Sequence, residues 1–186
     1  PCRPGSFSNT SGNSECIDCA PGTYQPLPGA TQCEVCGAGN YSANILSCEP
    51  CQLGEYCKAG VSTGERCPLE HSTTNGRGAA SADECVCQIG YYLQGVHHEG
   101  SGRCVPCQLD ATNCTSLGAT VATLPLLPDW WRLPNSTVLE RCFSISSCTG
   151  GDNASNLCGE GYEGAFCGVC SKDDNGTRYH RSVGKC

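Results

Sequence analysis

The sequence predicts a small, disulfide-rich fold in which tandem cysteine-rich repeats with short β-hairpins form an elongated rod. Cys accounts for 20 of the 186 residues, a larger share than the roughly 8–10% that marks a disulfide scaffold. The pattern Cys-x-x-Gly-x-aromatic recurs with its Cys at residues 2, 19, 36, 51 and 87, which indicates an internal repeat. Apolar stretches with helical spacing are absent. Each repeat is too short to enclose a core, so covalent bonds must hold it.

Residues 1–50 contain the most regular repeats. Cys2 and Cys16 have the same spacing as Cys19 and Cys33. This likeness predicts that the second Cys of each Cys-x-x-Cys pairs forward with the first Cys of the next one. The resulting bonds are Cys2–Cys16, Cys19–Cys33 and Cys36–Cys48. Each would close a short loop, which stabilises the fold by about 3 kcal/mol in the chain-entropy description.

The asparagines indicate a secreted glycoprotein. Six of the ten Asn residues begin an Asn-x-Ser/Thr acceptor sequence, more than chance predicts: Asn9, Asn40, Asn113, Asn135, Asn153 and Asn175. Cys114 occupies the middle of one of these sequences, which makes Asn113 the poorest acceptor. The even number of cysteines suits complete pairing in an oxidising compartment. We therefore expect an extracellular or cell-surface location.

Charge and hydropathy argue against some classes of binding partner. The net charge of -7 argues against binding to nucleic acid or to an anionic membrane surface. No apolar run reaches the roughly 18 residues of a membrane span. The sequence has no Met and no signal peptide, as expected for a processed chain or a fragment.

The repeat phrases resemble a known family. Cys19-Ala-Pro-Gly-Thr-Tyr24 and Gly29-Ala-Thr-Gln-Cys33-Glu-Val-Cys36 look like the cysteine-rich repeats of ephrin-receptor-like extracellular regions, which are related in style to tumour-necrosis-factor-receptor modules. The resemblance covers roughly residues 1–107. It implies a non-catalytic rod and does not specify a ligand.

Two further modules are suggested by their cysteine spacing. Cys51, Cys57, Cys67, Cys85, Cys87 and Cys104 are spaced like an epidermal-growth-factor-like (EGF-like) module, although the phrase at Cys87 also fits an ephrin-receptor-like repeat. The EGF-like resemblance implies Cys51–Cys67, Cys57–Cys85 and Cys87–Cys104. Residues 158–170 look like the end of a laminin-type EGF-like module, which implies Cys107–Cys142, Cys114–Cys148, Cys158–Cys167 and Cys170–Cys186.

Residues 115–141 form an insert that the laminin-type modules lack. Because of it, Cys107–Cys114 and Cys142–Cys148 remain the rival pairing. The expected organisation is therefore short repeats in residues 1–50, an EGF-like or ephrin-receptor-like module in 51–106, and a laminin-type module with the insert in 107–186.

The sequence gives little indication of a catalytic site or a metal site. Five Cys-x-x-Cys pairs could bind zinc, but a zinc protein would explain neither the glycan acceptors nor the Gly-x-aromatic phrase. His97 and His98 lack a third ligand nearby, and residues 173–176 lack the alternation of a calcium loop. No nucleophile elbow, phosphate loop or metalloprotease helix occurs. We expect no enzyme activity, cofactor or metal.

Two functions then remain. The first is a structural building block of a surface coat, matrix or filament, in contact with copies of itself or neighbouring surface proteins. The second is a ligand-binding ectodomain segment of a receptor or adhesion protein. Tandem repeats with few distinguishing side chains favour the first.

The insert contains the predicted contact with a partner. The stretch 124–134 carries both Trp residues of the chain, and three Pro residues keep it extended. Its predicted contact residues are Leu126, Leu127, Trp130, Trp131 and Leu133. Adjacent side chains of an extended segment point to opposite faces, so one Trp should cover the module and the other should face outward. The alternative is that both Trp side chains form a local core.

Overall fold

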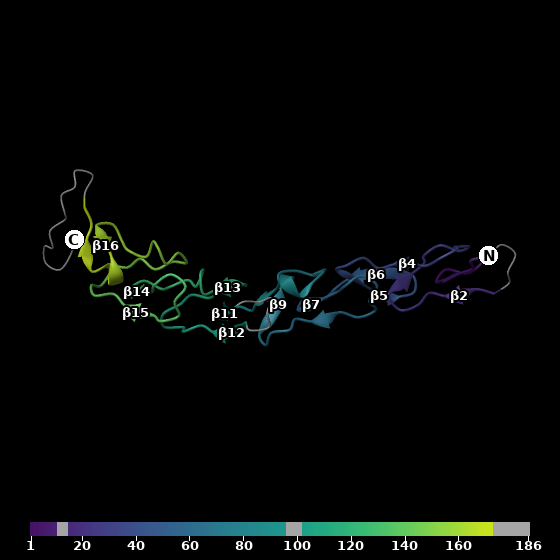
Figure 1. The fold of residues 1–186 in the computed structure, drawn as a ribbon, viewed down its shortest axis with the longest axis horizontal. Coiled ribbons are helices and arrows are strands. Elements are labelled where there is room, and N and C mark those ends of the chain that lie inside the picture. Colours follow the sequence, from purple (N-terminus) through teal and green to yellow (C-terminus); the bar gives the residue numbers. More distant parts are fainter. Residues whose placement is uncertain (11–14, 96–101, 173–186) are drawn as a thin grey trace. The chain divides into compact units, whose positions relative to one another are not determined.

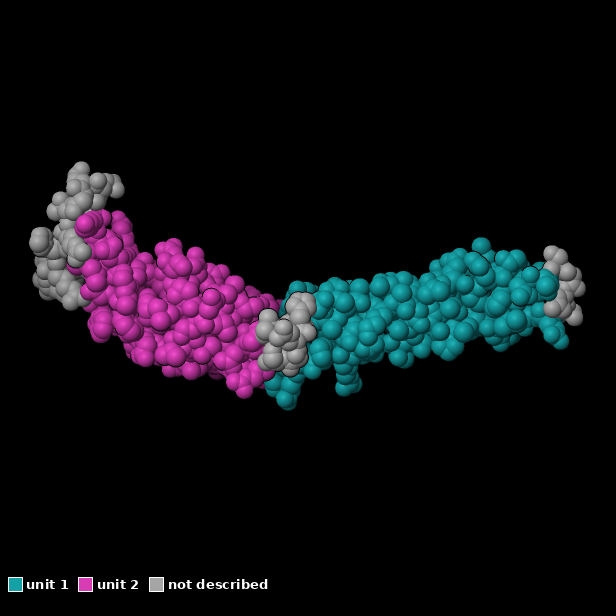
Figure 2. All heavy atoms as spheres, viewed as in Figure 1, with its two compact units in different colours: residues 1–86 teal, residues 87–186 magenta. Residues whose placement is uncertain are grey.

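The protein consists of short β-hairpins joined by disulfides, with two single turns of 3-10 helix and no longer helix in the described residues (Figure 1). The computed structural model describes residues 1–10, 15–95 and 102–172. The chain divides into two compact units, residues 1–86 and 87–186 (Figure 2). Their boundary falls inside the predicted module 51–106, and the division into three modules stays a prediction.

Every strand in the described part of the chain is two to five residues long. Unit 1 contains β1 (Ser6–Phe7), β2 (Ile17–Asp18), β3 (Thr23–Tyr24), β4 (Glu34–Val35), β5 (Asn40–Asn44), β6 (Ser47–Pro50), β7 (Glu55–Tyr56), β8 (Glu65–Arg66), β9 (Ser72–Thr74) and η1 (Ala82–Glu84). β10 (Cys85–Cys87) runs across the boundary. Unit 2 contains β11 (Tyr91–Gln94), β12 (Arg103–Pro106), β13 (Ala119–Thr120), β14 (Trp130–Trp131), β15 (Glu140–Arg141), β16 (Tyr162–Glu163), η2 (Ala165–Cys167) and β17 (Val169–Cys170).

The aromatic residue of each repeat phrase lies in the first strand of an antiparallel hairpin. Three of these rings sit opposite a Glu, in the pairs Tyr24↔Glu34, Tyr41↔Glu49 and Tyr56↔Glu65. The hydroxyl groups of Tyr24 and Tyr56 donate to these carboxylates at 2.9 and 2.6 Å. The hydrogen bond to the neighbouring Glu raises the pKa of both phenols. The repeated phrase thus produces a repeated strand register.

The glycine of each phrase joins one repeat to later ones. Gly5, Gly22 and Gly39 all have φ near +85°, which a residue with a side chain adopts only with strain. Their N–H groups donate to the carbonyl of Gln25, the hydroxyl of Ser42 and the carbonyl of Cys57.

These glycines also allow close contact with the second repeat along. A Cβ atom on Gly22 would lie 1.9 Å from the carbonyl oxygen of Gly60, and one on Gly39 would lie 2.4 Å from that of Gly78. Glycine is therefore needed here both for its backbone angle and for its lack of a side chain.

Each described cysteine is in a disulfide. The structure contains Cys2–Cys16, Cys19–Cys33, Cys36–Cys48, Cys87–Cys104 and Cys158–Cys167, the pairs expected from the sequence. It also contains Cys51–Cys57, Cys67–Cys85, Cys107–Cys114 and Cys142–Cys148. The expected Cys170–Cys186 bond involves a residue outside the described ones.

The EGF-like pairing of Cys51–Cys67 and Cys57–Cys85 is wrong in this structure. In the first two repeats the partner cysteine stands just before the second strand, as Cys33 stands before β4. The corresponding residue before β8 is Gly64. Cys67 instead follows β8, and its N–H donates to the carbonyl of Gly54, just as the N–H of Cys36 donates to that of Gly22. Cys67 therefore begins a new repeat and pairs forward, which leaves Cys51 to bond with Cys57.

We predict that non-reducing peptide mapping of the purified protein will recover Cys51–Cys57 and Cys67–Cys85. A protease that cleaves between these bonds separates them into different cross-linked peptides. Recovery of one knot that links all four cysteines would contradict this assignment. Cys36–Cys48, which the repeat spacing and the structure both contain, is the internal control.

The laminin-type pairing of Cys107–Cys142 and Cys114–Cys148 is also wrong, and the rival pairing is present. In each of the two bonds, a local turn brings together two cysteines that are close in sequence. The N–H of Ala111 donates to the carbonyl of Gln108 between Cys107 and Cys114, and their bond spans 7 residues. Cys142–Cys148 spans 6 residues in the same manner. Residues 115–141 lie between the two closed loops rather than inside a larger one.

Unit 2 has a small core built on a three-stranded sheet. β11 pairs antiparallel with β12 and parallel with β13. The buried core residues are Tyr92, Cys107, Cys114, Ala119 and Leu124. The insert thus contributes Ala119 and Leu124 to the core, and the stretch that follows is anchored to it.

Candidate partner-binding surface

The beginning of the predicted contact stretch is fixed to its own unit. Leu126 exchanges backbone hydrogen bonds of 2.8 and 2.9 Å with Gly151, and the N–H of Leu127 donates to the carbonyl of Ala111. The side chain of Leu126 is only 4% exposed. Leu126 therefore belongs to the interior of unit 2, and Leu127 is half-buried.

The two Trp residues have different neighbours. They form β14, which pairs with β15 in the register Trp130↔Arg141 and Trp131↔Glu140. The guanidinium of Arg141 lies 4.6 Å from the Trp130 ring centroid, a cation–π distance. Trp131 lies 4.6 Å from the ring of Phe166. Both Trp side chains are half-buried, so neither is a fully covered core residue.

Trp131 belongs to a group of three rings that we name the aromatic cluster: Trp131, Phe143 and Phe166. The Phe143 and Phe166 centroids lie 5.1 Å apart in an edge-to-face arrangement, which aromatic pairs favour. Phe143 is nevertheless 74% exposed, and nearby in sequence Ile145 is 84% exposed. The sequence analysis did not predict a role for either Phe residue. The available signal was that each is adjacent to a cysteine, Phe143 to Cys142 and Phe166 to Cys167.

The ring of Phe166 is presented by an unusual backbone. Phe166 lies in η2 with φ of +56°, and Cys167 follows with φ of +50°. Left-handed angles are costly for residues with side chains. The Cys158–Cys167 bond ties this turn to the chain before it. The turn directs Phe166 towards Trp131, so a disulfide and two strained residues build the aromatic cluster.

Arg132, which directly follows β14, holds the insert in place and was not predicted from the sequence. It is fully buried. One terminal nitrogen of its guanidinium donates to the carbonyls of Ala122 and Leu124 at 2.9 and 3.3 Å, and the other donates to the carbonyl of Leu133 at 3.5 Å. Burial lowers the pKa of Arg132. The guanidinium thus fixes the course of the insert, while Leu133, which is 59% exposed, stays at the surface.

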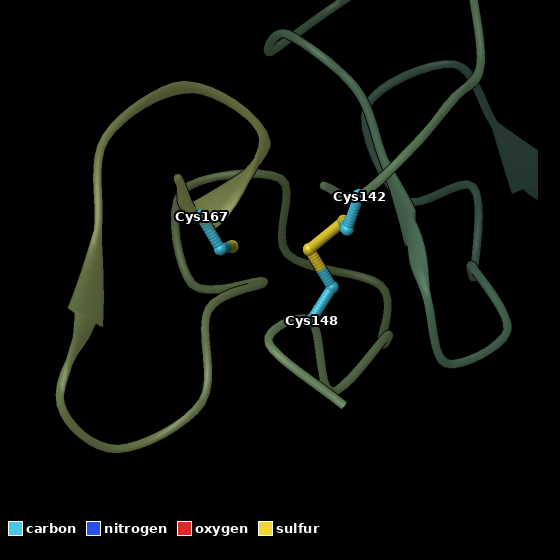
Figure 3. Close-up of side chains that lie close together, drawn as sticks. All are labelled: Cys142, Cys148 and Cys167. Atoms are coloured by element: carbon cyan, nitrogen blue, oxygen red, sulfur yellow. A yellow bond between two sulfur atoms is a disulfide. The ribbon is translucent and has the colours of Figure 1, made fainter. Parts of the chain in front are cut away.

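Three sulfur atoms gather beside the aromatic cluster. The Sγ atoms of Cys142, Cys148 and Cys167 lie within 4.8 Å of one another (Figure 3). Metal binding through sulfur requires thiolates, whereas all three are in disulfides. In this oxidised form the group is therefore a pair of neighbouring disulfides and not a metal centre.

The other sequence candidates are dispersed. Asn9, Asn113, Asn135 and Asn153 are exposed, and Asn40 is half-buried in β5. Asn175, His97, His98 and residues 173–176 lie outside the described residues. Where both cysteines of a Cys-x-x-Cys pair are described with their bonds, as for Cys16 and Cys19, they belong to different disulfides. Among the described residues, no helix is long and apolar enough to cross a membrane.

Comparison with known proteins gives two similarities. Residues 5–47 match the family described as tyrosine-protein kinase ephrin type A/B receptor-like. Cysteine repeat modular protein A of Toxoplasma gondii is 39% identical over 62 residues, which are 32% of this chain and 2% of that protein. The chain thus spans about 2% of the length of that relative. With the disulfide-linked hairpins, these similarities indicate a cysteine-rich repeat module of extracellular type.

Proposed function

We propose that this chain is a non-catalytic extracellular glycoprotein module that serves as a structural building block of a surface coat, matrix or filament. The observation that carries the proposal is how the repeats are connected. Disulfides close the first three hairpins, and backbone hydrogen bonds join one repeat to the next, as in Gly5 N–H to Gln25 and Gly29 N–H to Cys2. Repeats connected in this way suit a structural element, because each one is stabilised by the repeats beside it in the chain.

The contact with a neighbouring subunit is assigned to the exposed side of the aromatic cluster. Phe143 is largely exposed in this cluster, and Leu133 and Ile145, which are close in sequence to Trp131 and Phe143, are exposed apolar residues as well. Aromatic residues in a firmly held frame are common anchors of protein interfaces, because little side-chain entropy is lost when they are covered. The proposal therefore moves the contact from Leu126 and Leu127 to residues 130–145 and Phe166.

A second candidate function is a ligand-binding ectodomain segment of a receptor or adhesion protein. The same exposed aromatic cluster favours it, because an apolar surface on a monomer suits a foreign protein as well as a second copy. The two functions differ in self-association. Electron microscopy of native material and sedimentation of the purified chain separate them: assemblies support the building block, and a monomer that binds a different surface protein supports the receptor.

We predict that Phe143→Ser reduces self-association at least tenfold and changes stability little. The ring is 74% exposed, so its loss removes contact area without opening a core cavity. Sedimentation velocity at several concentrations measures the association, and a thermal melt measures stability. Val35→Ser is the matched control, because Val35 is 60% exposed but lies in unit 1. If both variants associate like the parent, the aromatic cluster is not the contact.

We also predict N-linked glycans on Asn9, Asn40, Asn135, Asn153 and Asn175, with lower occupancy at Asn113. The nitrogen of Ser155 donates to the side-chain oxygen of Asn153 at 3.0 Å, so this acceptor forms a local turn at the surface. Cys114, bonded to Cys107, is 6% exposed and stiffens the loop at Asn113. Intact-glycopeptide mass spectrometry of protein from its native source measures occupancy. Bare asparagine at most of these positions would refute the glycoprotein proposal.

A further inference from the structure

Two disulfides of unit 2 lie side by side because the backbone holds them there. Cys148 and Cys158 face each other in an antiparallel bridge. Hydrogen bonds on both sides support it, from the N–H of Thr149 to Leu157 at 2.8 Å and from the N–H of Gly159 to Ser147 at 2.9 Å. Each bridged cysteine belongs to a different disulfide. The backbone therefore holds the two disulfides next to each other.

The four cysteines differ in exposure. Cys148 is 1% exposed and Cys167 is fully buried, whereas Cys142 and Cys158 are half-buried. The buried sulfurs of the two bonds, those of Cys148 and Cys167, lie close to each other, since the Sγ atoms of Cys142, Cys148 and Cys167 are all within 4.8 Å of one another (Figure 3). A thiolate arriving from solvent therefore reaches Cys142 or Cys158 first, and the inner sulfurs reach each other.

We propose that these bonds form an exchange-coupled pair, in which a small monothiol that opens Cys142–Cys148 releases a free thiol at Cys158. The monothiol, as thiolate, attacks Sγ of Cys142, and the electron pair of the broken bond leaves on Sγ of Cys148. That thiolate attacks Sγ of Cys167. The Cys148–Cys167 bond forms, the Cys158–Cys167 bond breaks, and Cys158 leaves as a thiolate that takes a proton from water. Thiol–disulfide exchange proceeds by such successive displacements.

The exchange is balanced without an oxidant or reductant. Two disulfides and one thiol enter, and two disulfides and one thiol leave: the mixed disulfide on Cys142, the new Cys148–Cys167 bond and the thiol of Cys158. The free thiol has moved from a small molecule to a half-buried residue, which a disulfide of a neighbouring chain can reach. This provides a route to covalent links between copies and does not rest on the proposed aromatic contact.

The test uses the full chain and reduced glutathione as the monothiol. After brief exposure, free thiols are blocked with an alkylating reagent and the peptides are mapped without reduction. We expect the alkyl label on Cys158, glutathione on Cys142 and a Cys148–Cys167 cross-link. The Cys107–Cys114 bond is the internal control, because among the described cysteines it is not part of such a three-sulfur group. It should carry label and glutathione only on its own two residues.

Three results would overturn the proposal. The first is label on Cys148 with Cys158–Cys167 intact, which means simple opening of one bond. The second is glutathione on Cys167, which means direct attack on the second bond. The third is no label on Cys158 at a glutathione concentration that opens Cys107–Cys114. The double variant Cys158→Ser/Cys167→Ser should move the label to Cys148, and if it does not fold, the mapping of the parent chain still decides.

Discussion

Gly22→Ala is expected to destabilise unit 1 strongly, with a loss of about 3–5 kcal/mol. Two costs add at this residue. The backbone has φ of +87°, which costs a residue with a Cβ atom roughly 1–2 kcal/mol. The new methyl group would also lie 1.9 Å from the carbonyl oxygen of Gly60 and 2.4 Å from its carbonyl carbon. Backbone atoms cannot rotate away as a flexible side chain can, so the two repeats must separate.

Two other glycines distinguish these costs. Gly54→Ala keeps the positive φ, but its nearest atom, the hydroxyl of Thr73, is 3.7 Å away. We expect it to lose only about 1–2 kcal/mol. Gly37→Ala meets nothing within 4 Å and has no positive φ, and should be nearly neutral. Secreted yield and the urea midpoint of the three variants provide the measurement. Equal effects of Gly22→Ala and Gly54→Ala would show that the close approach of Gly60 is unimportant.

The glycine of the repeat phrase explains why the repeats could be predicted from the sequence. The Cys-x-x-Gly-x-aromatic phrase carries the turn, the strand and the disulfide within one short segment, so local physics determines all three. The fold class and the first three disulfides follow from it. The resemblance to an EGF-like module gave the wrong partners for Cys51, Cys57, Cys67 and Cys85, because it was used there in place of the repeat spacing. Gly64-Glu-Arg-Cys67 occupies the place of Cys33-Glu-Val-Cys36, and this substitution already assigns Cys67 to the next repeat.

The candidate surface could be predicted only in part. An extended segment with two adjacent Trp residues indicates opposite faces; in the structure Trp130 and Trp131 have different neighbours, and both are half-buried. The burial of Leu126 and the position of Phe166 depend on contacts with residues far away in sequence, such as the Leu126–Gly151 hydrogen bonds. The insert has no periodic pattern of apolar residues, so its sequence alone does not predict these long-range contacts.

The second large effect is expected for Arg132→Met, with a loss of about 2–3 kcal/mol. Replacing a buried charge with an apolar side chain is neutral in some proteins, because the desolvation cost disappears. Here the guanidinium is bonded to carbonyl oxygens and not to a carboxylate. Its removal leaves the buried Leu124 carbonyl without this donor, and an unsatisfied buried group costs about 1–3 kcal/mol. We therefore expect the loss to exceed the gain, and the stretch from Ala122 to Leu133 to loosen.

Two variants and a local probe decide this point. Arg132→Lys retains a cation but not the planar fork that reaches several carbonyls together, so it should fall between Met and the parent. Arg141→Met is the control, because Arg141 is exposed and its stacking on Trp130 should contribute about 1 kcal/mol or less. Amide exchange at Leu127, whose N–H donates to Ala111, reports on the insert. If Arg132→Met exchanges there no faster than Arg141→Met, Arg132 does not hold the insert in place.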